Sequence, residues 1–170
     1  MKQISLFLLI FLFYFNGNTP VNEVELREQV VVSAAKMLGT PYRRGGKSEN
    51  GYDCSGFVQY VLNQNNIKIS RSSCTQVFDG VEVPLETVRP GDVLIFSGSK
   101  KSKHPGHAAL VHHVDQNGVI YFIHSASGTG ITIDNMNMEY YKKRFIKARD
   151  VISMALIEQE TSNYSPDQGK

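Results

Sequence analysis

The chain has 170 residues, of which 41% are hydrophobic and 20% charged, and its formal net charge is +2. This length allows one domain with a real core but not two ordinary domains. The small net charge gives no strong field for nucleic acid, so we expect no nucleic-acid partner. No internal repeat is evident in the sequence.

The N-terminal segment is predicted to be a secretory signal peptide over residues 1–19. Lys2 precedes an apolar run over residues 4–15, and small and polar residues follow over residues 16–20. A run of about a dozen apolar residues is shorter than the ~20 that a spanning helix needs. We therefore expect export to the periplasm or cell envelope, or secretion, with no stable membrane span after the signal is removed. An uncleaved N-terminal anchor stays open, because no Ala-x-Ala-like cleavage site is present.

A first helix is predicted directly after this segment. Asn22 can cap it, and Glu25 three residues later completes a capping-box arrangement. Gly39 ends the helix, and Pro41 prevents its simple continuation. One face of the helix is marked by Leu26, Val30, Ala34 and Met37.

A second helix is predicted to begin near Cys54, which follows a turn. Asp53 and Ser55 supply N-cap character there. The apolar residues that recur at helical spacing are Phe57, Val58, Val61 and Leu62. The positive end of a helix dipole favours a thiolate, so we expect a lowered pKa of the Cys54 thiol and an activated nucleophile. The alternative is that Cys54 is a small buried hydrophobic residue.

The rest of the chain is predicted to change from helices to strands near Arg89. A short helix over residues 71–78 comes before the change, and another over residues 140–144 interrupts the strands. Strands are predicted over residues 92–96, 108–114, 119–124, 131–133 and 146–157. A polar tail over residues 158–170 lacks an apolar face and is expected to be disordered, so the folded domain is expected over residues 20–157.

Two histidines are predicted to meet through a hairpin. His107 begins one strand, His124 ends the next, and an Asn-Gly turn joins the two strands. Antiparallel pairing would bring these imidazoles side by side, as a cysteine hydrolase needs for its base and for the group that orients the base. His112 and His113 suit surface or packing roles, and His104 lies in a lysine-rich loop where it is expected to be solvated.

The two cysteines also allow other interpretations. Cys54, His107 and His124 could bind zinc, but tight ligand pairs such as Cys-x-x-Cys are absent, so we expect no metal and no cofactor. A disulfide between Cys54 and Cys74 would block the nucleophile. Cys74 is therefore expected to be an unpaired packing residue, with a redox-regulatory bridge as the alternative.

Seven short motifs together resemble one known family. They are Gly39-Thr40-Pro41-Tyr42-Arg43-Arg44-Gly45-Gly46, Asp53-Cys54-Ser55-Gly56-Phe57-Val58, Arg71-Ser72-Ser73-Cys74-Thr75-Gln76, Arg89-Pro90-Gly91-Asp92-Val93-Leu94-Ile95-Phe96, Gly106-His107-Ala108, Phe122-Ile123-His124-Ser125-Ala126-Ser127 and Tyr140-Tyr141-Lys142-Lys143-Arg144-Phe145. With these motifs in this order, the chain resembles the NlpC-type cell-wall cysteine peptidases, a bacterial branch of the papain-like fold. The resemblance implies an α+β fold in which N-terminal helices pack on an antiparallel sheet of about five strands.

The resemblance also implies roles for individual residues. Cys54 would be the nucleophile, His107 the general base and His124 the residue that orients it. Tyr42 would support the oxyanion, whereas composition alone leaves a half-buried loop aromatic as the alternative. Asp53 and Ser55 would bind the amine end of the substrate, with helix capping as the alternative.

Two further residues are predicted to form a wall of the substrate groove. By the same resemblance these are Arg71 and Ser73, and the alternative is that both are ordinary surface capping residues.

The implied function is hydrolysis of an amide bond in peptidoglycan peptides by a monomeric, exported enzyme. The bond would be of the γ-D-glutamyl-diaminopimelate or the D-alanyl-diaminopimelate type, and the sequence does not decide between them. Two alternatives stay open: a related acyltransferase or exported amidase toxin with another substrate, and a wall-binding protein without catalytic activity.

Overall fold

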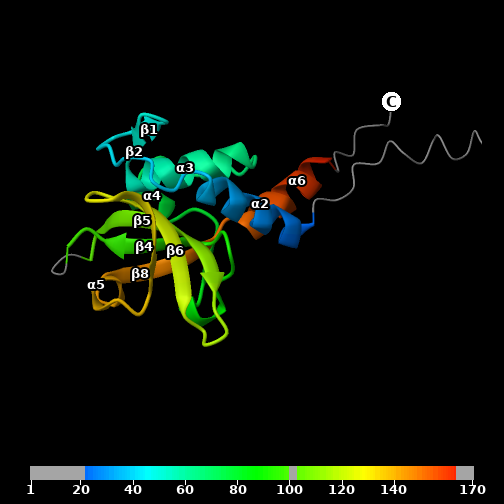
Figure 1. Ribbon diagram of the computed structural model, residues 1–170. Coiled ribbons are helices and arrows are strands. Elements are labelled where there is room, and N and C mark those ends of the chain that lie inside the picture. The colour runs from blue at the N-terminus through cyan, green and yellow to red at the C-terminus, as the bar shows by residue number, and fades with distance from the viewer. Residues whose placement is uncertain (1–21, 100–102, 164–170) are drawn as a thin grey trace, which may run out of the picture.

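The computed structural model describes residues 22–99 and 103–163, and Figure 1 traces its elements. The helices are α2 (Glu23–Ala35), α3 (Cys54–Gln64), α4 (Ser73–Gln76), the 3-10 helix η1 (Leu85–Thr87), α5 (Glu139–Lys142) and α6 (Ile152–Asn163). The strands are β1 (Lys47–Ser48), β2 (Gly51–Tyr52), β3 (Val81–Val83), β4 (Val93–Ser97), β5 (Pro105–Val114), β6 (Ile120–Ala126), β7 (Gly130–Asn135) and β8 (Phe145–Asp150). Helices packed on an antiparallel sheet confirm the predicted α+β class.

The main sheet of the described residues has six strands, in the order β3-β8-β4-β5-β6-β7. All neighbouring strands in it are antiparallel. The sequence predicts about five strands, and the additional one is β3, a three-residue edge strand that pairs with β8. Val81 and Glu82 are exposed there, so no buried apolar run marks this strand in the sequence.

The two N-terminal helices begin at capping side chains. Asn22 accepts a hydrogen bond from the backbone N–H of Val24 at the start of α2, and Asp53 caps α3. Both helix starts agree with the sequence prediction. Side chains of α2 that are buried include the predicted Leu26, Val30 and Ala34, and also Arg27, a charged residue that the apolar pattern does not reveal.

The main sheet is apolar on both faces. One face packs on α3 through a cluster that contains Phe57, Val61, Ile95, Leu110 and Ile123. The opposite face carries a second cluster that contains Leu94, Phe96, Val111, Phe122 and Tyr141. Successive residues of β4 thus alternate between two cores, which explains its continuous apolar run. In Figure 1, α3 and α5 accordingly lie on opposite sides of β4 and β5.

The C-terminal part of the predicted last strand is wrong. β8 ends at Asp150, whose Oδ1 accepts hydrogen bonds from the backbone N–H groups of Ile152 (3.1 Å) and Ser153 (3.0 Å). This cap starts α6, and Ile152 joins the apolar cluster that also contains Val30 of α2. Figure 1 shows α6 (red) beside α2 (blue). The predicted disordered tail also begins too early, since α6 continues to Asn163.

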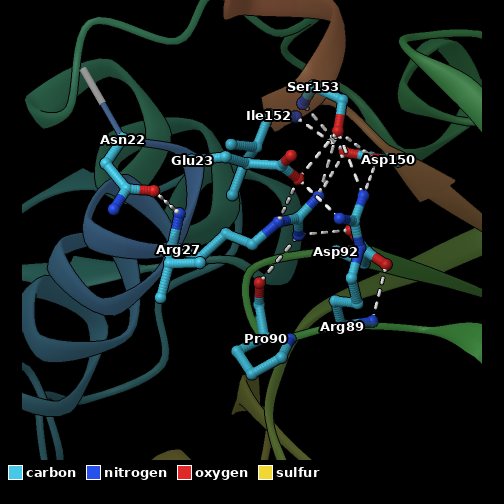
Figure 2. A network of polar contacts seen from close by, with 10 residues as sticks. Asn22, Glu23, Arg27, Arg89, Pro90, Asp92, Asp150, Ile152 and Ser153 are labelled. Atoms are coloured by element: carbon cyan, nitrogen blue, oxygen red, sulfur yellow. Dashed lines mark hydrogen bonds and ion pairs between the residues drawn. The ribbon is translucent and has the colours of Figure 1, made fainter. Parts of the chain in front are cut away.

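A network of ion pairs connects α2 to the sheet (Figure 2). The Nη1 and Nη2 atoms of Arg27 each lie 2.8 Å from a carboxylate oxygen, the first of Asp92 and the second of Asp150. Arg89 extends the network, with its Nη2 2.7 Å from the other oxygen of Asp150. The network therefore joins α2, the turn before β4 and the end of β8.

Some predictions lie outside the described residues. These are the signal peptide over residues 1–19, the tail beyond residue 163, and Lys100 and Lys101 of the lysine-rich loop. Within the part of the chain that is described, no helix is both long and apolar enough to cross a membrane.

Candidate active site

Several segments meet at one cleft of about 260 Å³. Cys54 enters it from the start of α3, His107 from β5 and His124 from β6. Tyr42 reaches it from the loop that precedes β1, and Tyr141 reaches it from α5. The structure therefore brings four of the predicted site residues into one cavity, although they are far apart in the sequence.

The position of Cys54 is fixed by the start of α3. Asp53 Oδ1 accepts a hydrogen bond of 2.6 Å from the backbone N–H of Gly56, which closes the first turn behind the cysteine. A Cβ atom at Gly56 would lie 2.3 Å from the carbonyl oxygen of Gly46. Only glycine therefore allows the loop before β1 to approach the helix so closely.

The expected lowering of the Cys54 pKa is wrong. Burial raises the pKa of the thiol above its usual value, and the negative charge of Asp53 raises it further. The backbone N–H groups of Ala108, Ser55 and Cys54 itself favour the thiolate, but burial outweighs them. Cys54 is consequently a neutral thiol at neutral pH, and a base would have to take its proton for the sulfur to become a nucleophile.

The two predicted histidines are in contact. His107 Nε2 lies 2.9 Å from His124 Nδ1, and their rings are perpendicular, with centroids 4.9 Å apart. Leu110 pairs with Ile123 across β5 and β6, so His107 and His124 are diagonal neighbours on one face of the sheet. The hairpin prediction that these imidazoles lie side by side is confirmed.

Both histidines are neutral at physiological pH. Burial lowers the pKa of His107 to about 3, and the neighbouring His124 adds to the effect. Burial also lowers the pKa of His124, although the carboxylate of Asp134 opposes that shift. A neutral imidazole has one protonated and one free nitrogen, so the direction of each hydrogen bond depends on which nitrogen carries the proton.

Asp134 and Tyr141, which were not among the predicted site residues, determine the direction of the hydrogen bond between His107 and His124. His124 Nε2 lies 3.0 Å from Asp134 Oδ2, and the hydroxyl of Tyr141 donates to the same oxygen at 2.6 Å. An ionised carboxylate only accepts, so Nε2 of His124 carries its proton and its Nδ1 is the acceptor. His107 Nε2 must then donate to His124, which leaves Nδ1 of His107 free to accept a proton.

The sequence contains only weak signals for these two residues. Asp134 lies in β7, where it pairs with Phe122 and is a diagonal neighbour of His124. Tyr141 falls in one of the family-like motifs, but nothing in that motif points to a histidine. Knowledge of the β6–β7 register would have been needed to find Asp134.

Tyr42 is half-buried at the wall of the cleft and forms an isolated backbone bridge with Tyr52. Burial raises the pKa of its phenol, and negative charge on Asp53 and on a Cys54 thiolate raises it further. The hydroxyl is therefore protonated at neutral pH and is a hydrogen-bond donor. No hydrogen bond of this hydroxyl to any described residue is present, so the donor is available inside the cleft.

The other four predicted site residues lie around the base of α3. Arg71 donates to both carboxylate oxygens of Asp53, at 3.0 and 2.8 Å, and to Ser55 Oγ at 3.1 Å. Ser73 is buried at the start of α4. Among the described residues, the cleft lining does not include Asp53, Ser55, Arg71 or Ser73. The capping alternative for Asp53 is confirmed, and the substrate contacts of all four stay predictions.

The remaining cysteine and histidines lie outside this cleft. Both cysteines are free, and Cys74 is exposed, so its expected packing role is wrong; its Sγ lies 3.1 Å from the carbonyl oxygen of Pro105. His113 is exposed and stacks on Tyr121, in agreement with a surface role. In the described part of the chain, no group of three or more His, Cys, Asp and Glu side chains is arranged to hold a metal ion.

Comparison with known proteins identifies the family. The model of the NlpC/P60 family matches residues 39–150, which is more than half of the chain and includes Cys54, His107 and His124. The chain belongs to the NlpC/P60 family. This confirms the resemblance predicted from the sequence motifs, and it makes the chain an enzyme of a cysteine peptidase family that comprises peptidoglycan endopeptidases and hydrolases.

Three similar proteins illustrate the range of this NlpC/P60 family. Murein DD-endopeptidase MepS/Murein LD-carboxypeptidase of Escherichia coli K12 is 31% identical over 134 residues, which are 78% of this chain and 67% of that protein. Gamma-DL-glutamyl hydrolase of Bacillus subtilis is 34% identical over 122 residues, 71% of this chain but 28% of that protein. The crystal structure of an NlpC/P60 family protein from Bacillus cereus matches with a TM-score of 0.66 and 27% identity, over 74% of this chain and 40% of that one.

Proposed function

We propose that this NlpC/P60 chain is an exported cysteine peptidase that hydrolyses an amide bond in peptidoglycan stem peptides or their cross-links. The observation that carries the proposal is the hydrogen-bond chain from Asp134 through His124 to His107, in the same cleft as the half-buried thiol of Cys54. This chain leaves one free imidazole nitrogen, Nδ1 of His107, in the cleft that also holds Cys54. A neutral thiol paired with a neutral, oriented base is the arrangement that nucleophilic catalysis requires.

The first half of the reaction forms an acyl-enzyme. His107 Nδ1 accepts the proton of the Cys54 thiol as the sulfur attacks the amide carbonyl carbon. The backbone N–H of Cys54 and the hydroxyl of Tyr42 donate to the oxyanion that develops on the carbonyl oxygen. His107 then gives the proton to the departing amine, the C–N bond breaks, and a thioester to Cys54 remains.

The second half releases the acid and restores the thiol. His107, again neutral, accepts a proton from a water molecule as its oxygen attacks the thioester carbonyl. The C–S bond breaks, the proton returns to the sulfur, and the peptide leaves with a new carboxyl group. Asp134 and Tyr141 act in both halves as positioning residues, because they hold His124 in the tautomer that accepts from His107.

The scissile bond is of the D-alanyl-diaminopimelate or the γ-D-glutamyl-diaminopimelate type. The Escherichia coli relative is named as a DD-endopeptidase and LD-carboxypeptidase, whereas the Bacillus subtilis relative is named as a gamma-DL-glutamyl hydrolase. Both names concern peptides that contain D-residues. The apolar segment over residues 4–15 supports export of the enzyme to the compartment in which peptidoglycan is found.

The test is digestion of purified peptidoglycan and of defined stem peptides, with fragments identified by mass spectrometry. We expect fragments with the intact protein and none with Cys54→Ala, and the fragment masses will name the bond. Cys74→Ala is the matched control, because it removes the exposed thiol and leaves the cleft intact. If no wall peptide is cut while iodoacetamide still modifies Cys54 in a His107-dependent manner, the assigned substrate class is wrong.

A further inference from the structure

Arg144 lines the cleft that holds Cys54 and His107, but the proposed mechanism gives it no role. It lies between α5 and β8, next to the C-cap residue Lys143, and two backbone hydrogen bonds fix its position. Its N–H donates to the carbonyl of Tyr141 at 3.0 Å, and its carbonyl accepts from the N–H of Ser97 at 2.7 Å. The guanidinium lies over the ring of Tyr140, with Cζ 3.7 Å from the ring centroid. Arg144 is thus held in place before any ligand arrives.

The guanidinium of Arg144 has donors that are not used. Its Nε and Nη1 atoms are buried and make no hydrogen bond to any residue of the described chain. The two buried arginines, Arg27 and Arg149, behave differently, since each donates several hydrogen bonds. Buried charged donors are costly unless they are paired, so a partner that is not part of the described chain is expected at Arg144.

The charge of the cleft indicates what kind of partner this is. Among the described residues that line it, Arg144 is the only one with a formal charge at neutral pH, because both histidines are neutral. The nearby carboxylate of Asp134 is already engaged by His124 and Tyr141. The cleft therefore presents one cation, partly shielded from water, to whatever enters it, and such a cation attracts an anion strongly.

We infer that Arg144 binds a free carboxylate of the substrate, so that the site takes peptides with an ionised carboxyl group close to the scissile bond. Guanidinium is well suited to this task, since its planar donors match the two oxygens of a carboxylate. This inference rests on the proposed function, because it names the substrate class of the same cleft. It predicts that neutral peptide amides are poor ligands even where the scissile bond is unchanged.

The direct test is a binding measurement without turnover. The probe is the tetrapeptide L-alanyl-γ-D-glutamyl-meso-diaminopimelyl-D-alanine, as the free acid and after amidation of its carboxyl groups, titrated calorimetrically into Cys54→Ala protein. We expect the free acid to bind at least about tenfold more tightly than the amide. Adding Arg144→Gln should remove that difference, so that acid and amide bind within about twofold of each other.

Lys143→Gln is the matched control for this experiment. It removes the same charge one residue away, where the side chain is 60% exposed and pairs with Glu139 on the surface. We expect it to keep the preference for the free acid. Arg144→Lys, which retains the charge but not the planar guanidinium, should keep only part of the preference for the free acid. Thermal unfolding of each variant checks that the fold is intact.

The inference is overturned if the Cys54→Ala protein binds acid and amide equally, if it binds neither at millimolar peptide, or if Arg144→Gln keeps the preference. These outcomes are separate from failure of the proposed function, which is read from cleavage by protein with the intact thiol. Cleavage that depends on Cys54 but shows no preference for carboxylates would reject the role of Arg144 alone. A preference that depends on Arg144 without any cleavage would reject the peptidase and keep the carboxylate site.

Discussion

Nε2 of His124 lies 3.0 Å from Oδ2 of Asp134, and this contact sets the direction of every hydrogen bond between Asp134 and the cleft. A carboxylate cannot donate, so the proton belongs to Nε2 of His124. The two residues are diagonal neighbours on β6 and β7, as His107 and His124 are on β5 and β6. One face of the adjacent strands β5, β6 and β7 thus carries His107, His124 and Asp134.

The hydrogen-bond chain from Asp134 through His124 to His107 predicts that Asp134→Asn lowers kcat by about 10²- to 10⁴-fold with little loss of stability. Asparagine can donate as well as accept, so it no longer selects one tautomer of His124. The nitrogen chemical shifts of the histidine rings report their tautomers, which a purely structural role of Asp134 would not alter. In the variant, His107 and His124 should each no longer adopt a single tautomer. Tyr141→Phe, which removes only one of the two groups that contact Asp134, should have a smaller effect.

Asp115→Asn is the control for that substitution, because Asp115 accepts hydrogen bonds in the β5–β6 turn, away from the cleft. It should leave kcat unchanged. If Asp134→Asn retained full kcat and normal histidine shifts, the orienting role of the carboxylate would be refuted.

The lowered pKa values of His107 and His124 make the free energy of unfolding depend on pH in a predictable direction. The folded-state pKa of His107 is about 3, and that of His124 is also below the ordinary value. As pH falls below about 6.5, the unfolded chain binds protons that the folded chain does not, so the free energy of unfolding decreases. Above that pH both states are neutral at these positions and the contribution vanishes.

Urea unfolding at pH 7.5, 6.5, 5.5 and 5.0 measures this effect. We expect a loss of up to about 1.4 kcal/mol per pH unit for each histidine below pH 6.5, and a smaller slope in His107→Gln. His113→Gln, at an exposed position, should keep the wild-type slope. Stability that is constant from pH 7.5 to 5.0 would contradict the assignment of His107 and His124 as imidazoles that stay neutral in the folded protein.

The sequence allowed prediction of those parts of the site that depend on local signals. The starts of α2 and α3 follow from the capping residues Asn22 and Asp53, and the meeting of His107 and His124 follows from an Asn-Gly hairpin. The pKa of Cys54 could not be predicted in this way. The helix N-terminus is a local feature, but the burial that outweighs it depends on how the sheet packs around the thiol.

Errors in the predicted fold likewise arise because tertiary packing overrides local signals. α6 was not expected because its start depends on the Asp150 cap and on packing against α2, whereas its residues Ile152 to Ile157 look strand-like in isolation. Arg27 and Arg144 are ordinary cations in the sequence. Only the tertiary structure distinguishes them. It buries Arg27 among carboxylates, and it leaves the Nε and Nη1 atoms of Arg144 without a hydrogen-bond partner in the described chain.

Tyr42 is predicted to contribute to the oxyanion hole through its hydroxyl. Tyr42→Phe should therefore lower kcat by about 10- to 10³-fold and change KM little, since the interaction strengthens only as negative charge develops on the carbonyl oxygen. Steady-state kinetics on the peptide identified by mass spectrometry will measure both constants. A rise in KM with unchanged kcat would instead make Tyr42 a residue that binds the ground state of the substrate.

The ion network of Figure 2 predicts different effects for its two arginines. The side chain of Arg27 is 6% exposed and contacts two buried carboxylates, whereas that of Arg89 is 49% exposed. Arg27→Met leaves Asp92 and Asp150 buried without their main partner, so we expect a loss of about 3–5 kcal/mol in the free energy of unfolding. Arg89→Met removes a partly solvated contact and should cost at most about 1 kcal/mol.

The pH dependence of the Arg27→Met effect tests its cause. Without the guanidinium, the pKa values of the Asp92 and Asp150 carboxyl groups rise in the folded state, because burial already raises that of Asp92 in the intact protein. The folded variant then binds protons more readily than the unfolded chain, so its deficit relative to wild type should shrink as pH falls from 7 to 5. Urea unfolding of both proteins at each pH cancels the histidine contribution, which they share. Equal losses for Arg27→Met and Arg89→Met, or a deficit that grows at low pH, would show that the burial of unpaired carboxylates is not the cause.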